Sequence, residues 1–471
     1  MKIFKAPSKR LAFIQPKIDD GNLTPPLGPL IMASIMEREG WEVGMFDERV
    51  DDGALRKAMD FKPGVVGISA VTASVLRGKA IAESVKEASP DTVVVFGGPH
   101  PTAMPDEVAG WNAVDFVVEG EGENAIKSLC RWLTESGSES QLSSIENLAY
   151  KNGAGVTRNP RCDFMPADQL DSLPMPAFHL LDLDRIFGKT VHGLYSRGSR
   201  ILPVMSSRGC PSPCTYCCRM MGFSIRYRSV NSLLDEMDFL ISRYALDEIW
   251  FEDDNFTASR RRAHEMLDAI IARNYGINMK FANGLRADGV DAALLEKLKR
   301  AGCYSLSFGI ETGSPKVLEL MRKKMSLEKA GENVKLAKSM GFLVGANCII
   351  GYPGETMDDI KTSLDYFMEL DLDSMAVVNL IPFPGTEARR VCEEKGYLTP
   401  LANDWNNYVF DIKSPRVLIE TELLSAVDVT KMINLAYRRM YLDPRRMFRI
   451  ARNMKPRELL LGVKTMLSKI F

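Results

Sequence analysis

The sequence predicts an α/β protein made of two α/β units in series, followed by a helical C-terminal region. Three observations support this prediction. Short apolar stretches of strand length alternate with longer stretches of helical period, which is typical of parallel strands joined by crossover helices. The alternation stops over residues 141–195 and then resumes. The chain has 471 residues, which is more than one hydrophobic core usually supports.

The first unit is expected to hold five strands in a doubly wound sheet. The strands are placed at Leu11–Gln15, Glu42–Phe46, Val65–Ser69, Thr92–Phe96 and Asp115–Val118. In this architecture, ligands bind beyond the carboxyl ends of the strands. The loops that follow the strands are rich in glycine, proline and small hydroxylated residues, so their backbone can approach a flat ligand closely. Ordinary turn formation would explain the same composition.

Residues 141–195 show no strong period and contain several prolines, so a linker with a short hairpin is expected there. Six more strands are placed near Ile201–Ser206, Glu248–Glu252, Lys280–Asn283, Tyr304–Phe308, Leu343–Ile350 and Met375–Leu380. Six βα units predict a partial (β/α)6 barrel, whose active site should lie at the carboxyl ends of its strands. The expected domains therefore cover residues 1–140, 196–390 and 391–471, with the linker over residues 141–195.

The composition argues against two classes of partner. The formal net charge is −1, so a general electrostatic affinity for nucleic acid is not expected. No run of about 18 apolar residues is present to span a membrane, and the first residues do not resemble a secretory signal. We therefore expect a cytoplasmic protein whose nine cysteines are reduced.

Four of the cysteines are gathered in one loop, at positions 210, 214, 217 and 218, directly after the first expected barrel strand. Thiolates of Cys210, Cys214 and Cys217 can hold an iron–sulfur cluster but leave one iron without a protein ligand, which is a catalytic rather than a structural design. A zinc site would need a second Cys or His pair, and His192 and His264 stand alone. Cys218 has no assigned role. The scattered cysteines, Cys130, Cys162, Cys303, Cys348 and Cys392, are expected to be small buried hydrophobes.

The C-x3-C-x-aromatic-C run resembles the radical S-adenosylmethionine (SAM) superfamily. This resemblance implies that the three cysteines hold a 4Fe-4S cluster, that SAM chelates the open iron and that Tyr216 packs near the adenine. An electron from the cluster would cleave SAM, and the resulting 5'-deoxyadenosyl radical would remove hydrogen from an unactivated carbon. An electron donor such as flavodoxin or ferredoxin is implied as well.

Polar segments after four later strands fit SAM-binding roles under the same resemblance. Asp253 and Asp254 follow the second strand, where such enzymes place groups for the methionine amine. Arg286 could reach the methionine carboxylate, and Glu311 lies in a segment that looks like the ribose-binding one. Ile349 belongs to the fifth strand. A carboxylate at a strand end is also commonly a solvated loop charge.

The segments PPLGP, GGPHPT and EGEGE in the first unit resemble the cobalamin-binding subgroup that contains the anaerobic magnesium-protoporphyrin cyclase and hopanoid methylases. The resemblance implies a Rossmann-like cobalamin-binding sheet before a partial TIM-like radical SAM barrel. Methylthiotransferases are less similar, because they need further N-terminal cysteines and this chain has none before Cys130. The corrin-binding residues expected from the resemblance are Pro26, Gly28, Ser69, Gly97, Gly98 and Glu119.

One departure concerns the cobalt ligand. Many cobalamin proteins carry Asp-x-His-x-x-Gly after the first strand, but here Pro25 stands where the histidine would be, and His100 is on a different loop. Either cobalamin binds without a protein imidazole, or the domain has kept the fold and lost the cofactor. Retention is favoured, because Ser69, Gly97 and Gly98 still match positions that would border a corrin.

The expected reaction is methylation of an unactivated carbon of a small molecule, apolar or lipid-like, with SAM used both as radical source and as methyl donor. Radical-driven cyclisation or oxidation without methyl transfer is the second hypothesis, and a corrinoid-binding protein with a structural cluster is the third. The C-terminal tail mixes basic residues such as Arg446, Lys464 and Lys469 with apolar ones. It is expected to form a helical cap with a solvated cationic face, or to contact an anionic membrane peripherally.

Overall fold

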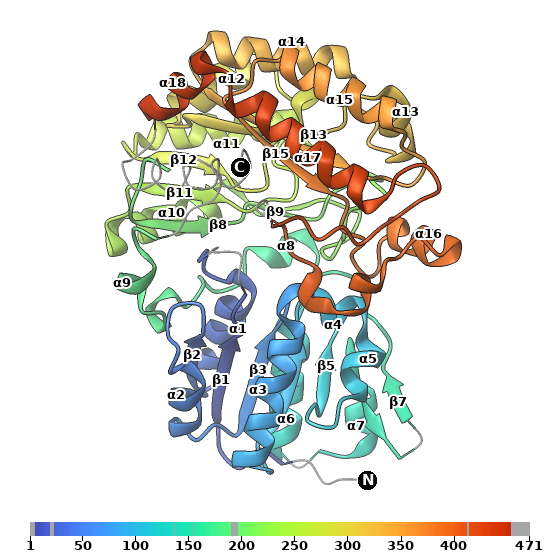
Figure 1. Cartoon of the computed structure of the whole chain (residues 1–471). Helices are drawn as coiled ribbons and strands as arrows, with labels where there is room; N and C mark the ends of the chain where they lie inside the picture. Colours follow the sequence, from blue (N-terminus) through green and yellow to red (C-terminus); the bar gives the residue numbers. More distant parts are fainter. Residues whose placement is uncertain are drawn as a thin grey trace. The chain divides into compact units, whose positions relative to one another are not determined.

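The computed structural model describes residues 5–18, 23–135, 137–153, 155–189, 196–411 and 414–453. The chain divides into two compact units, Met1–Phe187 and Gly188–Phe471 (Figure 1). Residues 141–187 thus belong to the first unit, whereas the sequence predicted a separate linker there. The other domain boundaries remain predictions.

The first unit is built on a seven-stranded sheet in the order β2-β1-β3-β4-β5-β6-β7. The strands are β1 (Arg10–Gln15), β2 (Glu42–Asp47), β3 (Val65–Ser69), β4 (Val93–Gly97), β5 (Phe116–Val118), β6 (Leu148–Asn152) and β7 (Gly155–Arg158). The first five are parallel and confirm the five expected strands, whereas β6 and β7 are antiparallel. The predicted hairpin therefore extends the sheet, because the apolar side chains of Leu148, Ala149 and Tyr150 are buried on it.

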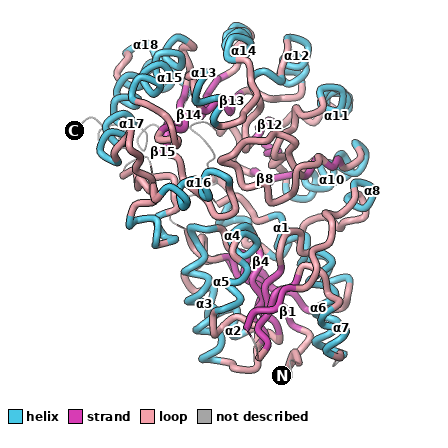
Figure 2. Tube along the Cα trace, turned by 90° about the vertical axis from the view of Figure 1, so that its right-hand side faces the viewer, coloured by secondary structure: helices cyan, strands magenta, loops and turns pink. Residues whose placement is uncertain are grey.

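Helices cover both faces of this sheet (Figure 2). They are α1 (Leu27–Arg38), α2 (Ala54–Asp60), α3 (Val75–Ala88), α4 (Pro99–Ala103), α5 (Pro105–Gly110), α6 (Glu123–Glu135) and α7 (Glu139–Ser143), followed by α8 (Ala167–Leu170) and α9 (Leu183–Ile186). Helix α1 packs with α6, and α2 packs with α3. Strands enclosed on both sides in this way are continuously apolar, as β4 is. The segment before α9 is tied to α1 by Ser34 Oγ, which donates to the carbonyl of Met175 at 2.6 Å.

Six parallel strands form the second unit, as the sequence predicted for a partial barrel. Sheets β8-β11-β12 and β13-β14-β15 each hold three of them. The bounds are β8 (Ile201–Val204), β11 (Glu248–Phe251), β12 (Asn278–Phe281), β13 (Ser305–Glu311), β14 (Leu343–Ile350) and β15 (Ser374–Asn379). Single parallel bridges, Met279 to Cys303 and Leu285 to Phe308, join the two sheets. The short strands β9 (Ser207–Arg208) and β10 (Arg226–Tyr227), which follow β8 in the chain, pair antiparallel with each other.

The barrel strands are joined by helices as the alternating pattern requires. They are α10 (Val230–Tyr244), α11 (Arg260–Arg273), α12 (Ala292–Arg300), α13 (Pro315–Leu320), α14 (Leu327–Ser339), α15 (Met357–Glu369) and α16 (Glu387–Lys395). On β13, the buried positions are apolar, as at Leu306 and Phe308, while the half-exposed alternate positions are small, as at Ser305, Ser307 and Gly309. At Gly309 the small residue is required, because a Cβ there would lie 2.9 Å from a carboxylate oxygen of Glu311.

The C-terminal region contains α17 (Ala426–Tyr441) and α18 (Pro444–Asn453). Helix α18 is held on the barrel by Arg446 and Arg449, which pair with Asp371 at 3.2 and 3.0 Å. The helix thus packs on the barrel, but buried Arg446 is not part of the solvated cationic face that was expected of the cap. The predicted tail residues Lys464 and Lys469 lie outside the described residues. Among the described helices, none is long and apolar enough to cross a membrane.

Candidate functional site

The cysteine loop leaves the end of the first barrel strand and is closed at its base by the β9–β10 pair, which joins Arg208 to Arg226. Gly209 begins the loop with a φ of +89°, and a Cβ on this residue would lie 2.4 Å from the carbonyl oxygen of Ser224. Only glycine fits there. The amide of Cys210 then donates to the carbonyl of Gly222 at 3.2 Å, so the loop turns back on itself directly at its first cysteine.

The three predicted ligands are free thiols that differ in exposure: Cys214 is buried, Cys210 is half-buried and Cys217 is exposed. A hydrogen bond from Cys217, the positive charges of Lys323 and Arg286, and a hydrogen bond from Tyr216 lower the pKa of the Cys214 thiol. Asn255 directs its amide towards Cys210, with Nδ2 3.8 Å from the sulfur. Iron–sulfur clusters are bound by thiolates, and hydrogen bonds to their sulfur atoms tune the reduction potential.

In the described part of the chain, no three His, Cys, Asp or Glu side chains converge as the ligands of a single metal ion do. A four-iron cluster binds each thiolate through a different iron, so its ligands surround it rather than meet at one point. The donor set and its position on one loop therefore fit a cluster, and the assignment of the three cysteines remains a prediction.

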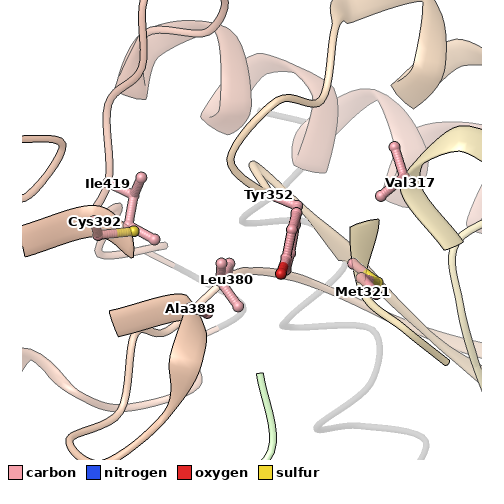
Figure 3. Close-up of a cluster of buried hydrophobic side chains, with 7 residues drawn as sticks. All are labelled: Val317, Met321, Tyr352, Leu380, Ala388, Cys392 and Ile419. Carbon is pink, nitrogen blue, oxygen red and sulfur yellow. The ribbon is translucent and has the colours of Figure 1, made fainter. Parts of the chain in front are cut away.

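Figure 3 shows a cluster of buried hydrophobic side chains in the second unit. Its buried members are Val317, Met321, Tyr352, Leu380, Ala388, Cys392 and Ile419. Tyr216 and Ile349, both predicted to contact SAM, pack against this cluster. The hydroxyls of Thr215 and Tyr352 are 2.6 Å apart, and the amide of Thr215 donates to the carbonyl of Met321 at 3.1 Å. The cluster therefore fixes the middle of the loop.

The two aspartates predicted after β11 have different surroundings. Asp253 is buried and accepts hydrogen bonds from the amide and hydroxyl of Ser206, at 3.0 and 2.6 Å, and from the hydroxyl of Ser207 at 2.5 Å. Its carboxylate therefore ties β11 to the start of the cysteine segment, while Asp254 is exposed. Glu252, which the sequence reasoning did not single out, is half-buried, and burial together with the charge of Asp253 raises its pKa to about 7.

Arg286 is engaged by protein groups. Its guanidinium pairs with Asp288 through two bonds of 3.1 and 3.0 Å and donates to the carbonyls of Lys323 and Lys324 at 3.1 and 2.9 Å. One nitrogen also lies 3.4 Å from the hydroxyl of Ser212 on the cysteine loop. The residue therefore connects three segments around the loop, and its predicted contact with the SAM carboxylate remains untested.

Glu311 ends β13 at a bulge with a φ of +74°, and its carboxylate accepts a hydrogen bond from Lys323 Nζ at 3.0 Å. The same ammonium donates to the phenol of Tyr216 at 3.1 Å. Lys323 was missed in the sequence, because it lies in the run Arg322-Lys-Lys324 and resembled part of a solvated charge cluster. In the structure, its two basic neighbours are exposed and Lys323 is buried.

The predicted corrin-binding residues lie at the carboxyl edge of the first sheet. Ser69 pairs with Gly97, and the φ of Gly98 is +97°, with a Cβ position 3.0 Å from the backbone of Ala70. Gly98 is thus required by internal packing. The Cβ positions of Gly28 and Gly97 are open, with no atom within 4 Å of the former and the nearest 3.8 Å from the latter.

The remaining predicted corrin-binding residues are held by other parts of the first unit. Pro26 caps the N-terminus of α1, and Arg49 donates to the carbonyl of Thr24 at 3.1 Å beside it. Glu119 is fully buried and is bound by Arg158 of β7 through two bonds of 3.0 and 2.6 Å. Glu119 therefore has a partner that links β5 to the antiparallel hairpin, and its cofactor role remains a prediction.

Neither described histidine of the first unit is placed as an open cobalt ligand. His100 is 1% exposed, its Nδ1 lies 3.3 Å from the hydroxyl of Thr72, and burial lowers its pKa to about 4. His179 pairs with Glu37 at 3.0 Å, in the last turn of α1 and so at the opposite end of that helix from Pro26. This agrees with the departure noted at Pro25.

Comparison with known proteins links both units to families. Residues 18–130 match the B12 binding domain, and residues 204–367 match the radical SAM superfamily. A methyltransferase of Pyrococcus horikoshii, described as uncharacterized, is 28% identical over 432 residues, covering 90% of this chain and 89% of its own. The anaerobic magnesium-protoporphyrin IX monomethyl ester cyclase of Rubrivivax gelatinosus is 24% identical, with 92% and 78% covered.

A solved structure is similar over almost the whole chain. The cobalamin-dependent S-adenosylmethionine radical enzyme OxsB, with aqua-cobalamin and SAM bound, matches with a TM-score of 0.70 and 16% identity, covering 98% of this chain and 72% of that one. At this level of identity, the likeness shows a shared fold.

Proposed function

The chain belongs to the cobalamin-dependent radical SAM methyltransferases and cyclases, and from this premise we propose that it methylates an unactivated carbon of a small molecule. The observation that carries the proposal is the closed loop that presents three free thiols at the end of the first barrel strand. The matched methyltransferase is 28% identical and 89% of its own length is covered, against 24% and 78% for the cyclase, and this supports methylation over cyclisation.

We propose that Cys210, Cys214 and Cys217 hold the 4Fe-4S cluster. When bound, this cluster supplies the electron that cleaves SAM and so generates a radical. The protein's part is to close the loop through Gly209, to stabilise the thiolate of Cys214 and to fix the loop on the hydrophobic cluster.

For SAM we propose Tyr216, Asp254, Arg286, Glu311 and Ile349 as the surrounding residues. Asp253 was expected in the same set, but its carboxylate already accepts three hydrogen bonds from the serines that begin the cysteine segment. We therefore assign Asp253 to positioning that segment. Glu252, whose pKa lies near 7, is available to exchange a proton at the end of β11.

For cobalamin we propose the open edge formed by Pro26, Gly28, Ser69 and Gly97, with Gly98 shaping the turn beneath it. When bound, cobalamin would carry the methyl group that SAM donates. We further propose that neither His100 nor His179 ligates cobalt, because one is buried and the other is paired with Glu37.

Product analysis of the full-length enzyme tests methylation. Protein reconstituted anaerobically with iron, sulfide and cobalamin is reduced and incubated with SAM and a candidate substrate. Methylation requires S-adenosylhomocysteine beside 5'-deoxyadenosine. Deoxyadenosine alone would support cyclisation or oxidation, and reconstituted protein that never cleaves SAM would support the third hypothesis, a corrinoid carrier.

The finer predictions about partners are proposals of the same kind. A small electron-transfer protein, flavodoxin or ferredoxin, is proposed as the reductant, and the location is proposed to be cytoplasmic. Because Arg446 and Arg449 pair with Asp371 while Arg445 and Arg452 are exposed, the proposed role of α18 is a cap. Peripheral membrane contact and an apolar substrate rest on the mixed basic and apolar residues of the whole tail, from Arg445 to Phe471, and liposome flotation of full-length and truncated protein tests them.

A further inference from the structure

We propose that Lys323 is a positioning residue for the cysteine loop, acting through Tyr216 and Glu311. This inference rests on the proposed function, because it assigns the loop to a cluster and to SAM. Lys323 itself follows α13 and is far from the cysteines in sequence, so its role arises only from the fold.

The contacts of the Lys323 side chain are few and specific. The ammonium lies 3.1 Å from the phenolic oxygen of Tyr216 and 3.0 Å from a carboxylate oxygen of Glu311. The side chains of Lys323 and Glu311 are only 8% and 10% exposed, so water screens the pair weakly. Because Tyr216 stands between Cys214 and Cys217, a bond to its hydroxyl fixes the turn that separates these two thiols.

The backbone around Lys323 is strained in a way that serves this placement. Arg322 and Lys324 have φ values of 50° and 48°, in the left-handed region that residues with a side chain rarely adopt. Such conformations persist where the surrounding structure imposes them, and they cluster at functional sites. Here, Arg286 binds the carbonyls of Lys323 and Lys324, and so holds the strained turn.

The same turn is bonded directly to the cysteine loop. The carbonyl of Met321 accepts the amide of Thr215 at 3.1 Å, and Arg286 reaches the hydroxyl of Ser212 at 3.4 Å. The segment from Met321 to Lys324 therefore contacts the loop through backbone, side chain and charge. The bond from Lys323 to the phenol of Tyr216, within the cysteine motif, shows that Lys323 contacts the loop itself and not only the barrel.

The ion pair also sets the charge beside the loop. In the native protein, the ammonium and the Glu311 carboxylate offset each other. Removing Lys323 alone leaves a buried carboxylate, whose negative charge lowers the reduction potential of a cluster held there. Removing both partners restores neutrality but not the bond to Tyr216. The potential of the double variant therefore reports the electrostatic role, and SAM binding by Lys323→Met reports the positioning role, since Glu311 is itself proposed to surround SAM.

The test compares Lys323→Met, Lys323→Arg and the double variant Lys323→Met/Glu311→Gln with wild-type full-length enzyme. Lys316→Met is the matched control, since the exposed Lys316 forms an ion pair with Asp359 of α15 away from the cysteine loop. All are reconstituted anaerobically, and three quantities are measured. They are the iron bound per chain, the midpoint potential of the cluster, and the Kd for SAM, which is taken from the change in the EPR spectrum of the reduced cluster on SAM addition.

We expect Lys323→Met to weaken SAM binding about tenfold, the loss typical of one charge-assisted hydrogen bond, and to shift the potential to a more negative value. The double variant should recover the wild-type potential but keep the weakened SAM binding. Lys323→Arg should recover most of both, and Lys316→Met should match wild type.

Two results would overturn the inference. If Lys323→Met bound SAM as wild type does, the ammonium would have no positioning role. If the double variant restored SAM binding as well as potential, the pair would be a structural ion pair alone. Wild-type protein that takes up no cluster would instead refute the proposed function, and the inference with it, and would be recognised before any variant is compared.

Discussion

Substitution of Gly209 by alanine tests whether closure of the cysteine loop is needed for cluster binding. The new Cβ would lie 2.4, 2.9 and 3.2 Å from the carbonyl oxygens of Ser224, Met221 and Gly222. These are backbone atoms, which cannot rotate away as side chains do. Relief of the overlap requires the two ends of the loop to separate, and this breaks the bond from the Cys210 amide to Gly222.

The cost can be worked from two contributions. A left-handed φ costs an alanine about 1 kcal/mol, and overpacking against fixed backbone adds about 2 kcal/mol. Gly276 supplies the matched control, because its φ is +68° but no atom lies within 4 Å of its Cβ position. Gly276→Ala should therefore lose about 1 kcal/mol of unfolding free energy and Gly209→Ala about 3 kcal/mol.

The assay measures the melting temperature of each apoprotein and the iron bound after anaerobic reconstitution. At roughly 2 °C per kcal/mol for a unit of this size, Gly209→Ala should melt roughly 6 °C below wild type and Gly276→Ala roughly 2 °C below it. Only Gly209→Ala should bind less iron. A Gly209→Ala protein that melts at the same temperature as Gly276→Ala and binds as much iron as the wild type would refute the reasoning.

Three further outcomes are expected. Burial raises the pKa of Glu355 to about 8, so the folded state holds a proton that the unfolded state releases near pH 4.5. The stability of the wild-type protein should therefore fall as pH rises from 4.5 to 8. Thermal melting across this range should show that Glu355→Gln lacks this part of the decline. Arg158→Met removes both hydrogen bonds to the buried Glu119 carboxylate and leaves it with Arg161, whose Nε is 4.0 Å away; this should cost about 3 kcal/mol in urea unfolding. Adding Glu119→Gln should recover most of the loss, and a mild single variant would argue against a structural pair. His100→Asn should leave the EPR spectrum of bound cob(II)alamin unchanged, whereas loss of nitrogen hyperfine splitting would identify His100 as the cobalt ligand.

The fold could be predicted because its signals are local. Apolar strands such as β3 and β4 alternate with helical periods in the sequence itself, and both the doubly wound sheet and the six-stranded partial barrel follow from that alternation. The hairpin β6–β7 was expected as well. Its addition to the first sheet depends on pairing with β5, some 30 residues earlier, and no local pattern reports such a contact.

The candidate site was predictable only in part, for the same reason. The cysteine spacing is visible in nine consecutive residues, whereas the role of Lys323 depends on partners 12 and 107 residues away. Asp253 and Asp254 look alike in sequence, and only the hydrogen bonds of Ser206 distinguish the buried one from the exposed one. Glu119 was predicted to bind a corrin, and its ion pair with Arg158 was not predicted because Arg158 lies 39 residues further on.

The central claim is that the loop of three thiols holds a cluster that cleaves SAM. Its most direct test is the yield of 5'-deoxyadenosine, measured by mass spectrometry after anaerobic reconstitution, reduction and incubation with SAM. Wild-type protein is predicted to release 5'-deoxyadenosine, and the variant Cys210→Ala/Cys214→Ala/Cys217→Ala to release none. Equal yields from the two proteins, or none from a wild-type protein that carries its full iron, would contradict the claim.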